Sequence, residues 1–319
     1  MLAELPVLGI VVPCFNEQAM LPITARELGS KIDSLIASGL ISDSSAIYFV
    51  DDGSSDNTWE LIVEFATQNS RFHGIKLSRN HGHQYALYAG LMEAKGDCLI
   101  SLDADLQDDI GVMDQMIMRY SEGSQIVYGV RSERSSDTRF KRWSASIHYR
   151  LASFFDIEAL PNHADYRLMS RRAIEMLAQY RETNIYLRGV VPLLGLPSAV
   201  VYYKREERRE GISKYGLKDM LGLSVQGITS FSIMPLRIIS VVGMLVFFIS
   251  FLFGGWALHA ALTGNSAAIA GWASTVIPIY LLGGLQLLAI GVAGEYIGKT
   301  YMETKRRPLY QVEKTTNNE

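Results

Sequence analysis

Five short apolar runs recur through the first 130 residues, and longer stretches separate them. Each run is rich in branched residues and is bounded by Gly, Pro or charged residues, which is typical of buried strands. The runs are residues 8–13, 46–50, 74–77, 98–102 and 125–129. The intervening stretches 18–38, 57–69 and 82–95 have the length of helices. This alternation predicts an α/β fold with a doubly wound, mostly parallel sheet.

A different pattern begins at Ile238. From there to Gly294 the chain contains no Asp, Glu, Lys or Arg, and His259 is the one residue of these 57 that can carry a charge. A membrane-spanning helix needs about 20 residues. The stretch therefore predicts two spans, at 232–258 and 273–296. A buried hairpin of a soluble domain is the alternative, and the length of the uncharged stretch argues against it.

Basic residues flank the uncharged stretch, with Arg237 directly before it, near the start of the first predicted span, and Lys299, Lys305, Arg306 and Arg307 after the second span. Positive flanks face the cytoplasm, so the N-terminal domain and both termini are expected there. The segment 217–225 is amphipathic and suits the membrane interface. The expected parts are a cytoplasmic domain (1–215), an interfacial helix (216–231), a transmembrane hairpin (232–298) and a basic cytoplasmic tail (299–319). The first residues lack a basic n-region, and no signal peptide is predicted.

Charge is distributed unevenly along the chain, although the net charge is only −3. Residues 1–130 hold 7 basic and 18 acidic residues, whereas residues 131–319 hold 23 basic and 15 acidic ones. The acidic half suits metal and nucleotide contacts, and the basic half suits phosphate or anionic lipid. Cys14 and Cys98 both fall in predicted strands, so no disulfide framework is indicated, which fits a reducing compartment.

Polar residues follow three of the predicted strands, and ligands of open α/β sheets bind beyond the carboxyl ends of strands. These residues are Asn16 and Glu17, Asp51 and Asp52, and Asp103 and Asp105. The carboxylates of Asp103 and Asp105 repel each other unless a cation lies between them, and oxygen ligands suit Mg²⁺ or Mn²⁺ on a diphosphate. A solvated acidic turn is the alternative for a lone Asp-x-Asp. The same placement at three strand ends favours one shared crevice.

Together these motifs resemble the family-2 inverting glycosyltransferases with a GT-A (Rossmann-like) fold. Within that family the chain is similar to dolichol-phosphate mannose synthases and, more closely, to bactoprenol glucosyltransferases of O-antigen modification. The other matching motifs are residues 78–84, residues 164–169 and Arg205-x-x-Arg208-x-x-Gly211-x-Ser213-Lys214-Tyr215. The resemblance covers nearly the whole chain, because the bacterial branch also ends in two spans. Processive synthases need Gln-x-x-Arg-Trp, whereas the Arg142-Trp143 pair here lacks that glutamine.

The resemblance implies a role for each matching residue. The nucleoside would contact Pro13, Phe15, Asn16 and Glu17, and its base and ribose would contact Asp51 and Asp52. The metal and diphosphate would be held by Asp103, Ala104, Asp105 and Gln107, with Asp103 and Asp105 as the metal ligands. Phosphate would be bound by Arg205 and Lys214, and the residues expected to carry catalysis are Asp105, Arg131, Asp165 and Arg208.

The implied reaction also decides which chemistry the site needs. A polyprenyl phosphate has its second pKa at about 6, so it is mostly dianionic at pH 7 and requires no general base. The site must instead hold one anion near another, which suits the planar fork of arginine. Arg131 and Arg208 are therefore expected at the lipid phosphate. Asp165 would orient acceptor or sugar, a base role stays open, and an ion pair with Arg167 is the structural alternative.

The expected function is transfer of a hexose, glucose from UDP-glucose, to undecaprenyl phosphate at the cytoplasmic face of the bacterial inner membrane. This step would serve modification of the O-antigen of lipopolysaccharide, with a flippase and a second glycosyltransferase acting downstream. A homo-oligomer is expected from the resemblance, and no nucleic-acid partner. One alternative is transfer of mannose, N-acetylglucosamine or an aminoarabinose derivative. Another is a membrane-anchored scaffold that binds nucleotide sugars without catalysis.

Overall fold

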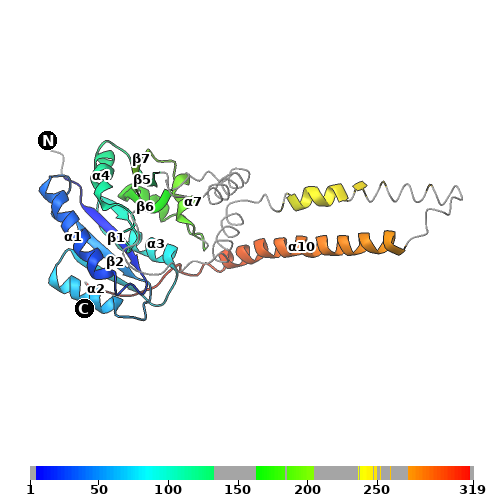
Figure 1. Ribbon diagram of the computed structural model, residues 1–319, viewed down its shortest axis with the longest axis horizontal. Coiled ribbons are helices and arrows are strands. Elements are labelled where there is room, and N and C mark those ends of the chain that lie inside the picture. The colour runs from blue at the N-terminus through cyan, green and yellow to red at the C-terminus, as the bar shows by residue number, and fades with distance from the viewer. Residues whose placement is uncertain are drawn as a thin grey trace. The chain divides into compact units, whose positions relative to one another are not determined.

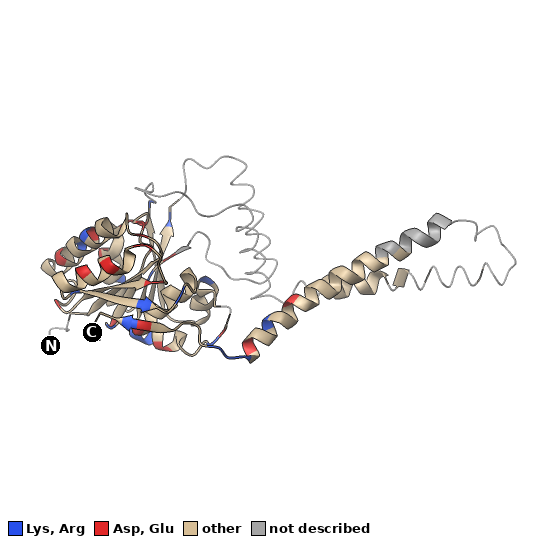
Figure 2. Ribbon diagram, turned by 90° about the horizontal axis from the view of Figure 1, so that it is seen from below, with Lys and Arg blue, Asp and Glu red and all other residues tan. Residues whose placement is uncertain are grey.

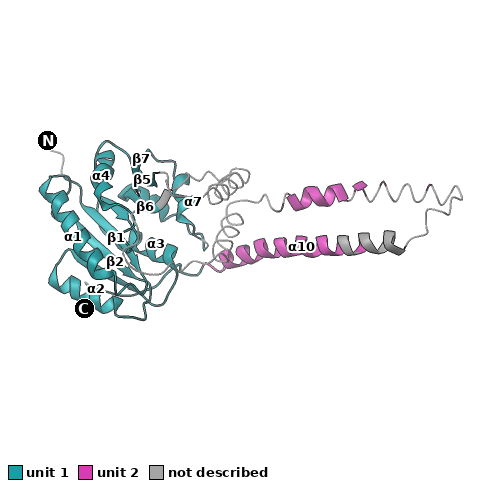
Figure 3. Cartoon of the chain, in the orientation of Figure 1, with its two compact units in different colours: residues 1–153, 158–215, 307–319 teal, residues 154–157, 216–306 magenta. Residues whose placement is uncertain are grey.

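The computed structural model describes residues 5–132, 163–183, 185–204 and 272–316, with scattered positions between 236 and 259. The chain separates into two compact units, which Figure 3 shows in different colours. Unit 1 comprises residues 1–153, 158–215 and 307–319, and unit 2 comprises residues 154–157 and 216–306. The last thirteen residues therefore belong to the same unit as the N-terminal domain.

Unit 1 is built on a sheet to which the described residues contribute eight strands, with helices packed against it (Figure 1). The strands are β1 Leu8–Cys14, β2 Ala46–Asp51, β3 Phe72–Leu77, β4 Cys98–Ser101, β5 Ile126–Arg131, β6 His163–Ser170, β7 Ser198–Tyr203 and β8 Val312–Thr315. Their order is β7-β5-β6-β4-β1-β2-β3-β8. Strands β6 and β8 run antiparallel to their neighbours, and the other pairs are parallel. The predicted α/β class with a mostly parallel sheet is confirmed, and the antiparallel strands β6 and β8 and the parallel strand β7 are additions to the five predicted strands.

Helices cover both faces of this sheet, as a doubly wound fold requires. They are α1 Leu21–Ala37, α2 Thr58–Gln68, α3 His83–Glu93, α4 Met113–Ser121 after the short 3₁₀ helix Ile110–Val112, α6 Arg171–Leu177 and α7 Leu187–Leu193. Alternate residues of β1, namely Leu8, Ile10 and Val12, share one core with the apolar faces of α1, α2 and α4. This core fixes the sheet and its strand ends in place.

Helix α3 packs on the opposite face of the sheet, where Gly90 permits a close approach. A Cβ atom at Gly90 would lie 2.4 Å from Cγ1 of Val11 and 2.7 Å from Cγ2 of Val50. Only a glycine lets the helix backbone come this near to β1 and β2. The amino-terminal end of α3 is thereby held close to the carboxyl ends of these strands.

Unit 2 contains helix α10, Trp272–Thr304, which spans 33 residues. Its charged residues lie in its carboxyl-terminal part (Figure 2). No helix formed by the described residues meets both the length and the apolarity needed to cross a bilayer. The second predicted span, 273–296, lies within α10, whereas the predicted interfacial helix (216–231) and most of the first span (232–258) lie outside the described residues.

Candidate active site

The predicted site residues that the structure describes lie at the end of the sheet formed by the carboxyl ends of its parallel strands. In the register of the sheet Cys14 pairs with Asp51, which brings the ends of β1 and β2 together. Strand β6 is antiparallel, and its Arg167 pairs with Ser101 at the end of β4. Asp165 precedes Arg167 and so reaches the same edge, although its strand enters the sheet from the opposite direction. The predicted site residues Asp51, Asp103 and Asp165 therefore all lie at this end of the sheet.

The loop after β1 is fixed mainly by Asn16. Its φ of 53° lies in the left-handed region, which asparagine tolerates better than most residues. Its side-chain oxygen accepts a hydrogen bond from the Ser55 amide at 2.8 Å, and its own amide donates to the Ser54 hydroxyl at 3.0 Å. Pro13 is buried at the end of β1, and Phe15 exposes 38% of its surface. The loop after β1 thus exposes the ring of Phe15, and Asn16 hydrogen-bonds this loop to the loop after β2.

Asp51 and Asp52 are both buried but have different partners. Asp52 accepts hydrogen bonds from the backbone amides of His81 at 2.7 Å and Gly82 at 2.8 Å, so both its oxygens hold the loop after β3. One oxygen of Asp51 accepts from the Ser54 amide at 3.1 Å, and the other is buried with no hydrogen-bond partner. Burial raises the pKa of both carboxyl groups. Asp52 therefore organises the site, whereas Asp51 has an unused acceptor.

Gly53 lets these two loops touch. Its φ is 67°, and a Cβ there would lie 2.5 Å from the carbonyl carbon of Arg79 and 2.6 Å from the amide nitrogen of Asn80. A side chain at this position would collide with backbone, which cannot move aside as a flexible side chain does. The loops after β2 and β3 are therefore packed as one body.

Asp103 and Asp105 lie in the loop after β4, and both are partly exposed. Desolvation by the surrounding protein raises the pKa of Asp103, and the nearby carboxylates of Asp165, Asp108 and Asp105 raise it further. Repulsion among carboxylates is the condition that a divalent cation relieves, and carboxylate oxygens are the donors that Mg²⁺ and Mn²⁺ prefer. The residues present therefore fit such a cation. Among the described residues, no group of three or more His, Cys, Asp or Glu side chains is arranged as a metal site.

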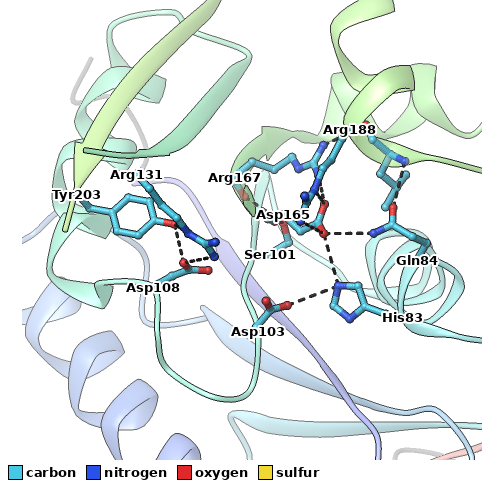
Figure 4. A network of polar contacts seen from close by, with 11 residues as sticks. His83, Gln84, Ser101, Asp103, Asp108, Arg131, Asp165, Arg167, Arg188 and Tyr203 are labelled. Atoms are coloured by element: carbon cyan, nitrogen blue, oxygen red, sulfur yellow. Dashed lines mark hydrogen bonds and ion pairs between the residues drawn. The ribbon is translucent and has the colours of Figure 1, made fainter. Parts of the chain in front are cut away.

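Asp165 lies at the centre of a polar network that Figure 4 shows from close by. One of its oxygens accepts from Arg167 at 2.6 Å and from Arg188 at 3.2 Å. The other accepts from Arg188 at 3.0 Å and from Gln84 at 3.2 Å. The imidazole Nε2 of His83 lies 3.6 Å from this second oxygen. The expected ion pair of Asp165 with Arg167 is present, and it is one of several partners.

The network controls the charge of its members. Desolvation would raise the pKa of Asp165, but His83, Arg188 and Arg167 outweigh it and hold that pKa well below its usual range. Desolvation lowers the pKa of His83, but Asp165 and Asp103, the latter 3.5 Å away, outweigh it and raise the pKa to about 9. Asp165 is thus a carboxylate and His83 an imidazolium at neutral pH. A carboxylate with so low a pKa is a poor proton acceptor.

Arg131, which was predicted at the lipid phosphate, is held by a second ion pair. Its guanidinium donates to Asp108 at 3.0 Å and to the hydroxyl of Tyr203 at 3.2 Å, and Tyr203 donates to Asp108 at 2.5 Å. Asp108 is buried, and the side chain of Arg131 keeps 24% of its surface exposed. Arg131 therefore joins β5 to the loop after β4, and part of it still reaches the surface.

The remaining predicted residues divide into two groups. Ala104 and Gln107 are buried in the loop after β4, where the carbonyl of Ala104 accepts from Thr24 at 2.6 Å. The predicted phosphate-binding residues Arg205, Arg208 and Lys214 lie outside the described residues. Sequence reasoning did not select Arg188, which no motif marks. His83 and Gln84 did stand in a matched motif, residues 78–84, and that motif was the available signal.

Comparison with known proteins adds the family. The model described as "Glycosyl transferase family 2" matches residues 9–177, which contain β1 to β6 and all the strand-end carboxylates described above. The chain belongs to glycosyl transferase family 2. The edge of the sheet where Asp103 and Asp165 meet is therefore the candidate active site of a glycosyltransferase, and the resemblance to this family is confirmed.

Several relatives match this glycosyltransferase over nearly its whole length. An uncharacterized glycosyltransferase of Bacillus subtilis, YkoT, is 49% identical over 98% of this chain and 93% of its own. A prophage bactoprenol glucosyl transferase homolog of Escherichia coli is 38% identical over 96% of this chain and 98% of its own. The bactoprenol glucosyl transferase of Shigella phage SfII is 38% identical over 97% and 98%, respectively.

Solved structures of other glycosyltransferases are more distant. Glucosyl-3-phosphoglycerate synthase from Mycobacterium tuberculosis, solved with Mn²⁺, UDP and phosphoglyceric acid, matches with a TM-score of 0.47 and 18% identity, over 70% of this chain and 76% of its own. A mannosyltransferase of Pyrobaculum calidifontis, solved with GDP-mannose and Mn²⁺, matches with a TM-score of 0.42 and 14% identity, over 94% and 86%.

Proposed function

We propose that this glycosyltransferase transfers glucose from UDP-glucose to a polyprenyl phosphate such as undecaprenyl phosphate, with inversion, at the cytoplasmic face of a bacterial inner membrane. The products are polyprenyl-phosphate-glucose and UDP. The bond between the anomeric carbon and the diphosphate breaks, and an oxygen of the acceptor phosphate forms the new bond. The observation that carries the proposal is the geometry around Asp165, whose carboxylate accepts hydrogen bonds from Arg167, Arg188 and Gln84.

The ionised state of Asp165 favours a phosphate acceptor over a sugar hydroxyl. A hydroxyl must lose its proton during transfer, which calls for a base with a pKa near the working pH. His83, Arg167 and Arg188 hold the pKa of Asp165 far below that, and His83 is itself protonated. A phosphate monoester, whose second pKa is about 6, arrives already deprotonated. Asp165 then orients the cationic groups around it, and through them it would orient the acceptor or the sugar, as predicted from the sequence.

The charges of the network also suit an anionic acceptor. His83, Arg167 and Arg188 carry three positive charges against two negative charges on Asp103 and Asp165. The side chains of His83 and Arg188 are 37% and 39% exposed, so they can face a ligand. Fixed positive charge near an incoming anion lowers the repulsion between the phosphate and the donor diphosphate.

The carboxylates of Asp103 and Asp105 would hold one Mg²⁺ or Mn²⁺ with the donor diphosphate. When bound, the cation neutralises the charge that develops on the leaving diphosphate. The chain's own contribution is to fix the donor, through the loop after β1 that Asn16 organises and the loop after β3 that Asp52 holds. Arg205, Arg208 and Lys214 are proposed as further phosphate contacts.

Glucose, UDP and the bactoprenol acceptor are proposed from the printed names of the relatives at 38% identity. A membrane location accords with such an acceptor. Residues 232–298 are proposed as a transmembrane hairpin with both termini cytoplasmic, because 57 residues in a row lack Asp, Glu, Lys and Arg. On α10 the side chains of Ile279, Leu287 and Ile290 are each more than 60% exposed, which suits a lipid environment.

The deciding experiment incubates the purified full chain with Mn²⁺, undecaprenyl phosphate and one labelled nucleotide sugar at a time. Labelled lipid with UDP-glucose alone supports the proposal. If labelled lipid forms instead with UDP-N-acetylglucosamine or GDP-mannose, the transferred sugar is N-acetylglucosamine or mannose and not glucose. Binding of UDP-glucose without product formation with any donor would support a non-catalytic scaffold and contradict the proposal.

A further inference from the structure

The end of the chain completes the sheet of unit 1. Strand β8 pairs antiparallel with the edge strand β3, with Thr315 opposite Ile75 and Val312 opposite Leu77. Beyond β8, the hydroxyl of Thr316 accepts from the amide of Gly74 at 2.9 Å, and its amide donates to the Gly74 carbonyl at 3.0 Å. The strand is thus fastened at its far end, and the residues just before it are brought to the carboxyl end of β3.

Those preceding residues, Leu309–Gln311, contact the loop that follows β3. We call them the C-terminal clamp. The carbonyl of Gln311 accepts from the amide of Ser78 at 2.9 Å, at the start of the loop. The carbonyl of Leu309 lies beside the imidazole of His81, in the middle of the loop, and favours its protonated form. The clamp therefore meets the loop at two points, with a backbone hydrogen bond at Ser78.

The third residue of the clamp contacts the helix that follows the same loop. The hydroxyl of Tyr310 donates to the carboxylate of Glu93 at 3.0 Å, and its ring meets Tyr88 edge to face at 6.2 Å between centroids. Glu93 and Tyr88 both lie on α3, whose first residues are His83 and Gln84. The clamp consequently contacts both the loop that precedes His83 and Gln84 and the helix that begins with them.

We infer that the C-terminal clamp positions His83 and Gln84 against Asp165, with Tyr310 as its main positioning residue. The inference rests on the proposed function for its kinetic consequence. Asp52 binds the amides of His81 and Gly82 in this loop, and the clamp binds the amide of Ser78 at its start. Displacing the loop by about 1 Å misplaces groups that must meet the substrate in one geometry, which costs rate more than binding.

The test compares three variants of the full chain: Tyr310→Ala, Tyr310→Phe and Lys314→Ala. Tyr310→Ala is expected to lower kcat about tenfold with KM for polyprenyl phosphate within about twofold, because the loop is displaced while the phosphate contacts remain. Its His81 and Gly82 amides should exchange hydrogen about tenfold faster. Tyr310→Phe keeps the ring contact with Tyr88 and should recover most of kcat.

Lys314→Ala is the matched control, since Lys314 lies on β8 and contacts Trp59, at 5.4 Å from its ring, rather than the loop. It is expected to keep kcat and the exchange rates of His81 and Gly82. An equal fall of kcat in Tyr310→Ala and Lys314→Ala would overturn the inference and assign the segment a general stabilising role. Unchanged exchange at His81 and Gly82 in Tyr310→Ala would overturn it as well. A full chain that transfers no sugar contradicts the proposed function, and the exchange rates then still decide whether the clamp holds the loop.

Discussion

Arg188 binds Asp165 with two parallel hydrogen bonds, from Nε at 3.2 Å and from Nη2 at 3.0 Å, one to each carboxylate oxygen (Figure 4). The pair joins the first turn of α7 to the start of β6. A guanidinium fork fixes the plane of the carboxylate, which a point charge such as lysine does not. Arg188 therefore determines how Asp165 faces His83.

Replacing Arg188 by lysine is expected to lower kcat by about one to two powers of ten, because removing such contacts costs roughly 1.5–3 kcal/mol. The charge stays, so UDP affinity should change little. Steady-state kinetics and calorimetry with UDP separate the two effects. The control is Arg181→Lys, since Arg181 is an exposed arginine shortly before the same helix. Full activity of Arg188→Lys would show that the fork is not needed.

Removing the metal should stop transfer. Asp105→Ala is expected to abolish product formation even at saturating donor, and Asp105→Asn nearly so, because neither side chain offers the charge that balances a divalent cation. In the intact protein, EDTA should have the same effect and added Mn²⁺ or Mg²⁺ should reverse it. Product formation at the normal rate in EDTA would disprove the metal role of Asp103 and Asp105.

The hydrophobic pattern sufficed to predict β1 to β5, because a strand buried on both faces is a continuous apolar run, whereas the more exposed parallel strand β7 was not predicted. All five predicted runs are strands, and their ends deviate by at most two residues from β1 to β5. Strand β8, with the sequence Val-Glu-Lys-Thr, is short and largely polar, so its pairing depends on the edge it meets. That edge is distant in sequence, and no local signal specifies it.

The site was predictable to the extent that it depends on strand ends. Asp51, Asp52 and Asp103 reach one end of the sheet, as parallel topology requires, and Asp165 reaches it from the start of the antiparallel strand β6. The role of each carboxylate depends on its contacts with residues of other elements. These tertiary contacts are not encoded in the local sequence pattern. Asp52 illustrates the difference, because its oxygens accept from two backbone amides of another loop, and its sequence position alone does not indicate these partners.

Asp52→Ala should therefore weaken nucleotide binding through the loop it holds. Loss of the bonds to the amides of His81 and Gly82 leaves two partly buried donors without a protein partner, and even a fully buried donor costs only roughly 1–3 kcal/mol when unsatisfied. We expect UDP affinity to fall about tenfold while KM for polyprenyl phosphate stays within about twofold. Calorimetry and kinetics at varied lipid measure the two. An equal loss for both ligands would mean that the loop serves the whole site.

The proposed hairpin makes a prediction about topology. Tags placed at residue 1 and at residue 319 should both be protected from protease added to intact cells, and a tag at Asn265 should be cleaved. Two spans return the chain to its starting side, and the basic residues at both flanks keep that side in the cytoplasm. Western blots before and after permeabilisation give the result. Cleavage at only one of the two termini would exclude an even number of spans.

The buried oxygen of Asp51 without a hydrogen-bond partner predicts a stability effect that depends on pH. Burial raises the pKa of Asp51 above its unfolded value, so ionisation costs the folded state stability as pH rises through that range, and the cost is absent in acid. Asp51→Asn, measured without nucleotide, should unfold at nearly the wild-type temperature near pH 4. At pH 7 it should be more stable by about 1 kcal/mol, which corresponds to a melting temperature roughly 3 °C higher.

Asp52→Asn is the contrasting variant: its new NH₂ group faces a backbone N–H, so it should be destabilised at pH 7. Thermal unfolding at both pH values measures each difference. A gap for Asp51→Asn that is the same at pH 4 and pH 7 would show that the charge of Asp51 carries no cost in the fold.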